Sequence, residues 1–202
     1  EVAGASVEGW DPDAVVDAMR GQPGTEVSLK IRRPGVDEPV PFAVTRAVIH
    51  LRSVPFALTL GDGVGYVPLQ AVSETSFQEV KAAVDSLRRE GAVKLILDLR
   101  GNPGGALDQG VAITDLFLNP GQLVVETRGR APQQSESFSA RDPEAYPDLP
   151  LVILVDERSA SASEISAGAL QDHDRAVVVG APTFGKGSVQ TLFPLTGGNI
   201  LR

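Results

Sequence analysis

Two short runs near the start of the chain alternate apolar and polar residues. They cover residues 25–33 and 40–46, and this alternation places the apolar side chains of each run on one face of a β-strand. The turn sequence between them, PGVDEP, predicts a β-hairpin. Ahead of the hairpin, Asp11 and Pro12 predict the start of a short helix. Fewer than about 50 residues make only a marginal core, so we expect this segment to be part of a larger domain.

From about residue 48 the pattern changes, first to a connecting stretch with the turn sequence GDG and then to alternating strands and helices. The Ser-, Pro- and Gln-rich residues 129–148 predict a long surface loop. The order of elements is typical of an α/β core with largely parallel strands. Helices are predicted over residues 75–90, 106–118 and 161–172, and strands over residues 93–99, 122–128, 151–155, 175–180 and 188–195.

Composition narrows the classes of function. Among 202 residues, 18 basic and 26 acidic side chains give a net charge of −8, the wrong sign for a protein that binds nucleic-acid phosphates. The absence of cysteine excludes disulfides and thiolate nucleophiles, and the two histidines, His50 and His173, leave little to build a metal site. No apolar run approaches the roughly 20 residues of a membrane span. No signal peptide is visible, so we expect a cytosolic protein or a processed or trimmed piece.

The first candidate site is the glycine-rich turn LRGNPGGAL, which joins the predicted strand at 93–99 to the next helix. In open α/β folds, sites gather at the loops that follow the carboxyl ends of strands. Backbone N–H groups of Gly104 and Gly105 can point at an anion there, as an oxyanion hole or a phosphate cradle requires. The turn lacks the Lys-Ser/Thr of a P-loop, so a nucleotide site is disfavoured. Taken alone, the two glycines are better explained as a tight turn.

The second candidate site is the loop VDERSASASEI, which also leads from a strand into a helix. Ser161 and Glu164 fit the S-x-x-E capping box, a purely structural explanation. A hydroxyl at a helix start also lies beside the next free N–H, that of Ala162, at the positive end of the helix dipole. A serine nucleophile at position 161 would therefore sit next to half of its own oxyanion hole.

Such a nucleophile needs a base. His173 lies 12 residues further along the predicted helix, about 18 Å from Ser161 along its axis, so it is too far away. His50 belongs to the connecting stretch and is not excluded by chain distance. Lys186, between two glycines in GAPTFGKGSVQ, is the third candidate. Lowering its pKa from about 10.4 to roughly 7 or 8 costs about 3–5 kcal/mol, which burial among apolar groups can impose.

Three motifs in this order resemble those of the C-terminal processing proteases, also called tail-specific proteases. The motifs are LILDLRGNPGGAL, LVDERSASASEISAGALQD and VVVGAPTFGKGSVQT. The resemblance covers essentially the whole chain and implies a core of the Clp protease/crotonase type over residues 65–202. It also implies that residues 1–47 are the C-terminal half of a PDZ domain, joined to the core by connecting strands at 48–64. We expect the peptide groove of the PDZ domain and the C-terminal part of the core to be incomplete.

The resemblance assigns roles to residues of these motifs. It implies that Ser161 is the nucleophile, Lys186 the general base and Gln190 the residue that orients the lysine. It further implies that the N–H groups of Ala162 and of a glycine in NPGG, Gly105, form the oxyanion hole. Asp172 matches an aspartate sometimes named as functional. Because Asp172 lies about 16 Å beyond Ser161 on the same helix, we expect it to be structural and to pair with Arg175.

The implied activity is that of a serine endopeptidase that cleaves protein substrates near their C-termini through an acyl-enzyme, without a metal or a cofactor. The resemblance also implies a periplasmic or cell-envelope location, and a homo-oligomer or an adaptor protein is compatible with it. Two alternatives stay open: an inactive peptide-binding scaffold or fragment of the same family, and a crotonase-like acyl-CoA enzyme. The second gives Ser161 and Lys186 no role and lacks a basic cluster for CoA phosphates. The glycines flanking Lys186 would allow the dyad to assemble only when peptide binds.

Overall fold

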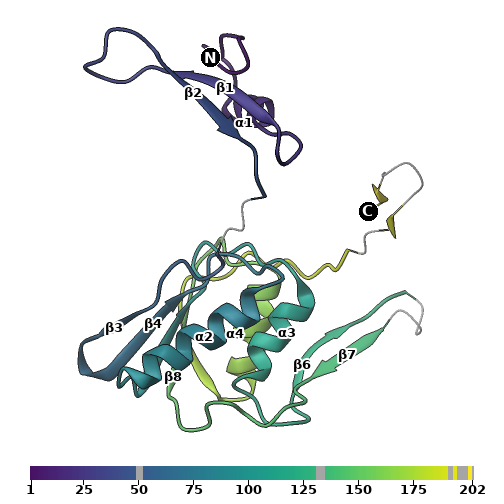
Figure 1. Ribbon diagram of the computed structural model, residues 1–202. Coiled ribbons are helices and arrows are strands. Elements are labelled where there is room, and N and C mark those ends of the chain that lie inside the picture. Colours follow the sequence, from purple (N-terminus) through teal and green to yellow (C-terminus); the bar gives the residue numbers. More distant parts are fainter. Residues whose placement is uncertain (49–51, 131–134, 191–192, 195–199, 202) are drawn as a thin grey trace. The chain divides into compact units, whose positions relative to one another are not determined.

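The computed structural model divides the chain into two compact units, residues 1–51 and residues 52–202. We call them the N-terminal unit and the core unit (Figure 1). The structure describes residues 1–48, 52–130, 135–190, 193–194 and 200–201.

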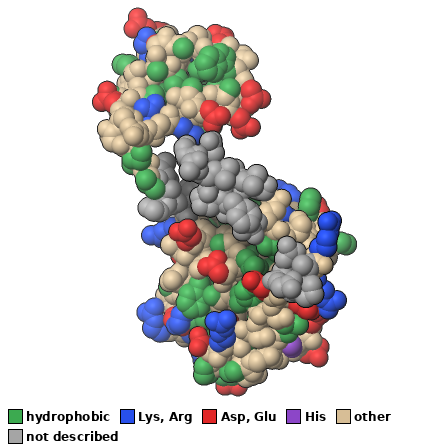
Figure 2. Space-filling model, turned by 90° about the vertical axis from the view of Figure 1, so that its right-hand side faces the viewer, with side chains coloured by type: hydrophobic (Ala, Val, Ile, Leu, Met, Phe, Trp, Pro, Cys, Tyr) green, Lys and Arg blue, Asp and Glu red, His purple; other side chains and the backbone are tan. Residues whose placement is uncertain are grey.

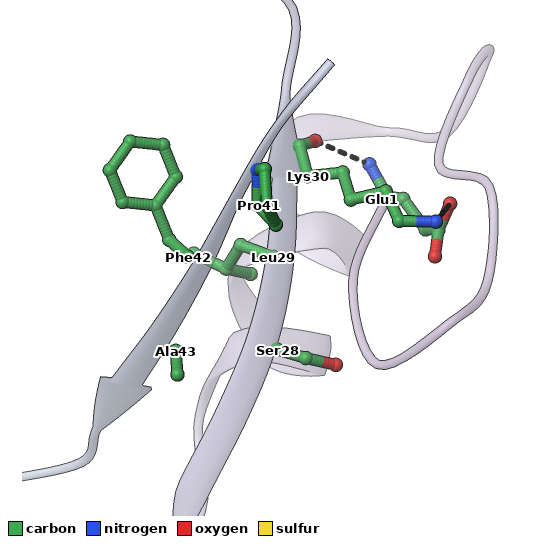
Figure 3. A pocket seen from close by; sticks show the side chains of 7 residues that line it. All are labelled: Glu1, Ser28, Leu29, Lys30, Pro41, Phe42 and Ala43. Atoms are coloured by element: carbon green, nitrogen blue, oxygen red, sulfur yellow. Dashed lines mark hydrogen bonds and ion pairs between the residues drawn. The ribbon is translucent and has the colours of Figure 1, made fainter. Parts of the chain in front are cut away.

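The N-terminal unit consists of one helix and one hairpin. Helix α1 (Pro12–Met19) begins after Asp11, whose side chain accepts a hydrogen bond from the N–H of Asp13. Strands β1 (Glu26–Ile31) and β2 (Val40–Thr45) pair antiparallel, which confirms the predicted hairpin. The first residues of the chain lie along the other edge of β1, where the amino group of Glu1 donates to the carbonyl of Lys30 at 3.0 Å. Glu1 and residues 28–30 and 41–43 of the hairpin line a shallow pocket of ≈ 260 Å³ (Figure 3).

A five-stranded sheet forms the centre of the core unit. The order of its strands is β3 (Leu58–Leu60), β4 (Val64–Pro68), β5 (Lys94–Asp98), β8 (Leu151–Val155) and β9 (Ala176–Gly180). The last four pair parallel, and only the edge strand β3 is antiparallel. A short 3₁₀ turn, η1 (Gly61–Gly63), connects β3 to β4. The predicted α/β core with largely parallel strands is therefore confirmed.

Three helices cover one face of this sheet: α2 (Ser76–Arg89), α3 (Leu107–Asp115) and α4 (Ala162–Asp172) (Figure 1). In the three central strands β4, β5 and β8, residues on one face point into the core between the two layers, including the fully buried Val67, Leu97 and Ile153. Burying a side chain of this size contributes about 1.5–3 kcal/mol. Because the strands are parallel, their carboxyl ends meet at one edge of the sheet, and the two candidate loops leave from that edge after β5 and β8.

Two predicted elements differ from the structure. Residues 136–139, expected to be loop, form strand β7 (Glu136–Ser139), which pairs antiparallel with β6 (Leu123–Thr127). This pairing satisfies the backbone of a Ser-rich stretch whose composition alone indicates a loop. In the predicted strand at 188–195, residues 188–190 have no regular structure and residues 191–192 and 195 lie outside the described residues. Among the described residues of this range, only β10 (Phe193–Pro194) is a strand, and it pairs with β11 (Ile200–Leu201).

Candidate active site

The glycine-rich loop after β5 is held in place by Asn102, which is completely buried. Its side-chain amide donates to the carbonyl of Leu69 at 2.7 Å, and its Oδ1 accepts from the N–H of Gly104 at 2.9 Å. The carbonyl of Asn102 accepts from the N–H of Ala160 at 3.0 Å. One side chain and its own backbone thus connect the loop to strand β4 on one side and to the serine loop on the other.

The three alternating serines have different surroundings. Ser159 and Ser163 are buried, and their hydroxyls donate to the carbonyls of Leu99 at 2.8 Å and of Asn102 at 3.1 Å. Ser161 is only half-buried, and its hydroxyl donates no hydrogen bond within the described part of the chain. Two of the serines therefore fasten the loop to the β5 side of the site, and the third is available for chemistry.

Ser161 has a strained backbone. It is the N-cap residue of α4, with φ 56° and ψ −116°, a region that residues with a side chain seldom adopt. Such a conformation costs about 1–3 kcal/mol and is concentrated at active sites. A sharp strand-to-helix turn of this kind exposes the side chain of its central serine in known hydrolases. The strain has no sequence signal, because Ser161 is not a glycine, asparagine or aspartate.

The two loops meet at Gly104, where there is no room for a side chain. Gly104 has φ +84°, and a Cβ atom there would lie 2.5 Å from the carbonyl oxygen of Ala160, 2.7 Å from the nitrogen of Ala162 and 2.8 Å from Cβ of Ser161. The backbone of the glycine-rich loop is thus in direct contact with the backbone of the serine loop. Glycine at this position is required by packing as well as by its φ angle.

Two N–H groups at this junction have no acceptor among the described residues, those of Gly105 and Ala162. Gly105 forms an isolated parallel bridge with Val72, in which the neighbouring groups Gly104 C=O and Ala106 N–H make the hydrogen bonds. Ala162 is the first residue of α4 and has no intrahelical acceptor. The N–H of Ser161 is bound elsewhere, so the free donor at this helix start is that of Ala162.

The acceptor for the Ser161 N–H is the carboxylate of Glu164, at 2.7 Å. This is the contact that the S-x-x-E pattern predicts. The same carboxylate also accepts hydrogen bonds from the Thr183 hydroxyl at 2.7 Å and from the N–H groups of Gly185 at 2.7 Å and Lys186 at 2.9 Å. Burial opposes ionisation of this carboxyl, but these hydrogen bonds lower the pKa of Glu164 below its ordinary value.

Lys186 is brought near Ser161 by its backbone. The N–H groups of both residues donate to the same oxygen, Oε2 of Glu164, at 2.7 and 2.9 Å. The distance between the two backbone nitrogens therefore cannot exceed the sum of these two lengths. The side chain of Lys186 is exposed, and its ammonium group has no hydrogen-bond or ion-pair partner among the residues that the structure describes. Gln190, four residues further on, is also exposed.

Two of the remaining candidates, His173 and Asp172, lie at the far end of α4 from this junction. His173 follows the unbroken helix α4, and its Nε2 is 2.8 Å from the carbonyl oxygen of Leu123. His50 lies outside the described residues. The expected pairing of Asp172 with Arg175 is wrong. Arg175 instead pairs with Glu144 at 2.6 Å and donates to the carbonyls of Tyr146 and Leu149, because it points towards segment 144–149, whereas Asp172 is exposed at the end of the helix.

A cluster of charged side chains supports the glycine-rich loop from β5. Asp98, at the end of this strand, accepts from the Tyr66 hydroxyl at 2.6 Å and from the guanidinium of Arg100 at 2.6 Å. Burial raises the pKa of Asp98, but the hydrogen bonds from Arg100 and Tyr66 outweigh it and lower the pKa below its ordinary value. In the second loop, Asp156 accepts from the N–H of Gly101 at 2.8 Å. Asp98 therefore holds the start of the glycine-rich loop, and Asp156 joins this loop to the serine loop.

Neither a metal centre nor a membrane-spanning helix is found in the described segments. They contain no group of three or more His, Asp or Glu side chains arranged to hold a metal ion. None of their helices combines the length and apolar character needed to cross a bilayer. On the face of the molecule drawn in Figure 2, basic and acidic side chains are interspersed.

Comparison with known proteins identifies relatives over the whole chain. It is 41% identical over 206 residues to a carboxy-terminal-processing protease of Bartonella bacilliformis, covering 100% of this chain and 47% of the relative. It is 44% identical over 200 residues to a carboxyl-terminal-processing protease of Synechocystis, covering 98% of this chain and 46% of the relative. The chain thus spans about half the length of both relatives.

A solved structure and a family model agree with these relatives. The structure of a photosystem II D1 C-terminal processing protease matches with a TM-score of 0.62 and 28% identity, covering 98% of this chain and 54% of that protein. The match supports an α/β fold of the same kind for the core unit. The model of peptidase family S41 matches residues 63–202, which include both loops and Lys186. This chain therefore belongs to peptidase family S41.

Proposed function

We propose that the protein is a serine endopeptidase that cleaves protein substrates near their C-termini with a Ser161–Lys186 dyad. The observation that carries the proposal is the junction at Gly104. There a strained, half-buried Ser161 lies beside the N–H groups of Gly105 and Ala162, which have no acceptor among the described residues. Backbone donors without an acceptor close to a hydroxyl are what the oxyanion hole of an acyl-transfer enzyme requires.

The reaction follows from the chemistry of these groups. Neutral Lys186 takes the proton of the Ser161 hydroxyl, and the serine oxygen attacks the carbonyl carbon of the scissile peptide bond. The resulting oxyanion accepts hydrogen bonds from Gly105 and Ala162, worth about 3–4 kcal/mol per donor. The lysinium then protonates the leaving amine, which yields an ester on Ser161. Water, deprotonated by Lys186, hydrolyses the ester and restores the serine.

We further propose that the dyad assembles when substrate binds. Lys186 is exposed in the structure, and neighbouring Phe184 and Val189 are 69% and 61% exposed, so neither apolar side chain is yet packed. A peptide that covers them would remove water from the lysine, and burial among apolar groups lowers the pKa of an ammonium group. Gln190 then orients the lysine. Catalytic contacts are often long in apo enzymes and tighten in the substrate complex.

Substrate and location are predictions from family membership. The named relatives are carboxy-terminal-processing proteases, which supports protein C-termini as the substrate class. The assignment of the N-terminal unit to half of a PDZ domain, and a location in the periplasm or cell envelope, are part of the same proposal. Residues 1–51 form a compact unit of their own, which is compatible with their being part of a domain separate from the core.

The proposal is tested with single substitutions in the full-length protein. Ser161→Ala and Lys186→Ala should each abolish cleavage of a peptide with a free C-terminus, measured by mass spectrometry, and Ser161→Ala should also abolish labelling by a fluorophosphonate. Retained cleavage in either variant contradicts the dyad. Tight peptide binding without cleavage by the wild-type protein would instead support the non-catalytic scaffold.

A further inference from the structure

The carboxylate of Glu164 accepts more hydrogen bonds than a helix cap requires. In the capping box at this helix start, the Glu164 side chain needs to accept only the bond from the N–H of Ser161. Three more donors come from a segment about 20 residues further along the chain: the Thr183 hydroxyl and the N–H groups of Gly185 and Lys186. Both oxygens are used, with Oε1 binding Thr183 and Gly185 and Oε2 binding Ser161 and Lys186.

Residues 183–187, which contain Lys186, have few other backbone attachments to the described part of the chain. Residues 182–190 form no helix or strand, and most of them are exposed. Apart from the bonds to Glu164, the backbone bonds that join residues 183–187 to described residues are Phe184 N–H to the carbonyl of Ser159 at 3.0 Å and Gly187 N–H to that of Gly185 at 3.1 Å. A segment with two flexible glycines around its lysine would otherwise adopt many conformations.

We propose that Glu164 is a positioning residue for the Ser161–Lys186 dyad, because its carboxylate accepts the backbone N–H groups of both residues and so fixes the distance between their backbones. This inference rests on the proposed function. Oε2 acts as a bridge between the nucleophile and the base at the level of the main chain, while both side chains keep their rotational freedom. Because this oxygen accepts the N–H of Ser161, the N–H left without a described acceptor at this helix start is that of Ala162.

The ionised carboxylate is essential to this role. All four partners are donors, and a carboxylate offers only acceptors. Glutamine has nearly the same shape but carries two N–H bonds on one side of its head group, so it can satisfy the donors on one oxygen only. In Glu164→Gln, either the Ser161/Lys186 pair or the Thr183/Gly185 pair therefore faces another donor. The substitution should loosen the link without leaving a cavity.

The chain offers a matched control in Glu79. It also lies in the first turn of a helix, is half-buried, and accepts one N–H, that of Val54 at 2.9 Å, and one hydroxyl, that of Thr75 at 2.6 Å. It fastens residues 52–57 to α2 and contacts neither Ser161 nor Lys186. Glu79→Gln therefore measures the effect of losing a comparable structural link elsewhere in the core unit.

The experiment compares Glu164→Gln, Glu79→Gln and the wild type in the full-length protein, by peptide-cleavage kinetics and thermal unfolding. We expect kcat of Glu164→Gln to fall about 100-fold with little change in KM, the loss typical of a misplacement of about 1 Å. Glu79→Gln should lower Tm by a similar amount and keep kcat within about threefold of the wild type. Similar kcat values for both variants would overturn the positioning role.

A second measurement covers the case in which Glu164→Gln does not fold. Thr183→Val removes one of the four donors and leaves the carboxylate in place. It should lower kcat about fivefold, the scale of one hydrogen bond, and speed hydrogen exchange of the N–H groups of Gly185 and Lys186. Unchanged kcat and unchanged exchange contradict the proposal. Cleavage retained by Ser161→Ala would refute the proposed function itself, whereas an inactive Ser161→Ala with an unaffected Glu164→Gln refutes only the role of Glu164.

Discussion

Replacing Gly104 by alanine is expected to destabilise the protein and to displace an N–H group at the proposed oxyanion hole. Two costs can be worked out from the structure. At φ +84° the backbone conformation of a residue with a Cβ costs about 1–2 kcal/mol of stability. The added Cβ would also lie 2.5, 2.7 and 2.8 Å from atoms of residues 160–162, and relieving such overpacking costs about 1–3 kcal/mol. These terms together correspond to a fall in Tm of about 10 °C for a protein of this size.

Gly101→Ala separates the two terms. Gly101 has a similar φ of +72°, but the nearest atom to its added Cβ is in the flexible side chain of Arg158, at 3.7 Å. This variant should therefore lose only the stability that the positive φ costs, about 1–2 kcal/mol. Because its loop is not pushed against Ala162, it should keep most of its activity.

The assays are thermal unfolding and peptide cleavage by the two variants. In Gly104→Ala the contact with the Ala162 nitrogen should shift the oxyanion donor, and a displacement of about 1 Å lowers kcat about 100-fold. In Gly101→Ala kcat should stay close to that of the wild type. Equal Tm and equal kcat for the two variants would refute the argument that Gly104 sets the distance between the two loops.

Two further comparisons test strain and charge pairing. Ser161→Gly and Ser161→Ala should both be inactive. In urea denaturation the glycine variant should be more stable by about 1 kcal/mol, because glycine adopts the positive φ without strain. Equal stability would show that the turn is not strained. Glu144→Gln should lower the free energy of unfolding by about 3 kcal/mol, because it leaves the largely buried Arg175 without its counter-charge. Asp172→Asn should change the free energy of unfolding by less than about 0.5 kcal/mol. The opposite order would contradict the pairing of Arg175 with Glu144.

Local sequence patterns predicted most of the fold and one contact of the candidate site. Alternation and helical periodicity placed the hairpin and the three helices of the core unit, because these patterns reflect which face of each element is buried. The S-x-x-E pattern predicted the contact between Ser161 and Glu164. The three hydrogen bonds that Glu164 accepts from residues 183–186 could not be predicted, because they depend on how β9 returns the chain to the start of α4.

The errors have the same origin. Strand β7 owes its conformation to pairing with β6, so a Ser-rich composition could not reveal it. Arg175 is close to Asp172 in sequence, but the orientation of its side chain is set by carbonyls of the segment before β8. The strain at Ser161 depends on the geometry of the strand-to-helix turn, which no residue type in the loop signals. Long-range contacts therefore decide the details of the site that composition and spacing leave open.

The backbone of Ser161 has an evolutionary consequence. At φ 56° and ψ −116° a serine is retained only while selection for chemistry outweighs selection for folding. A descendant that kept the fold as a scaffold but no longer cut peptides would gain stability by substituting glycine here. The residue at this position in a diverging lineage would then record whether catalysis is still under selection, before any other part of the site had decayed.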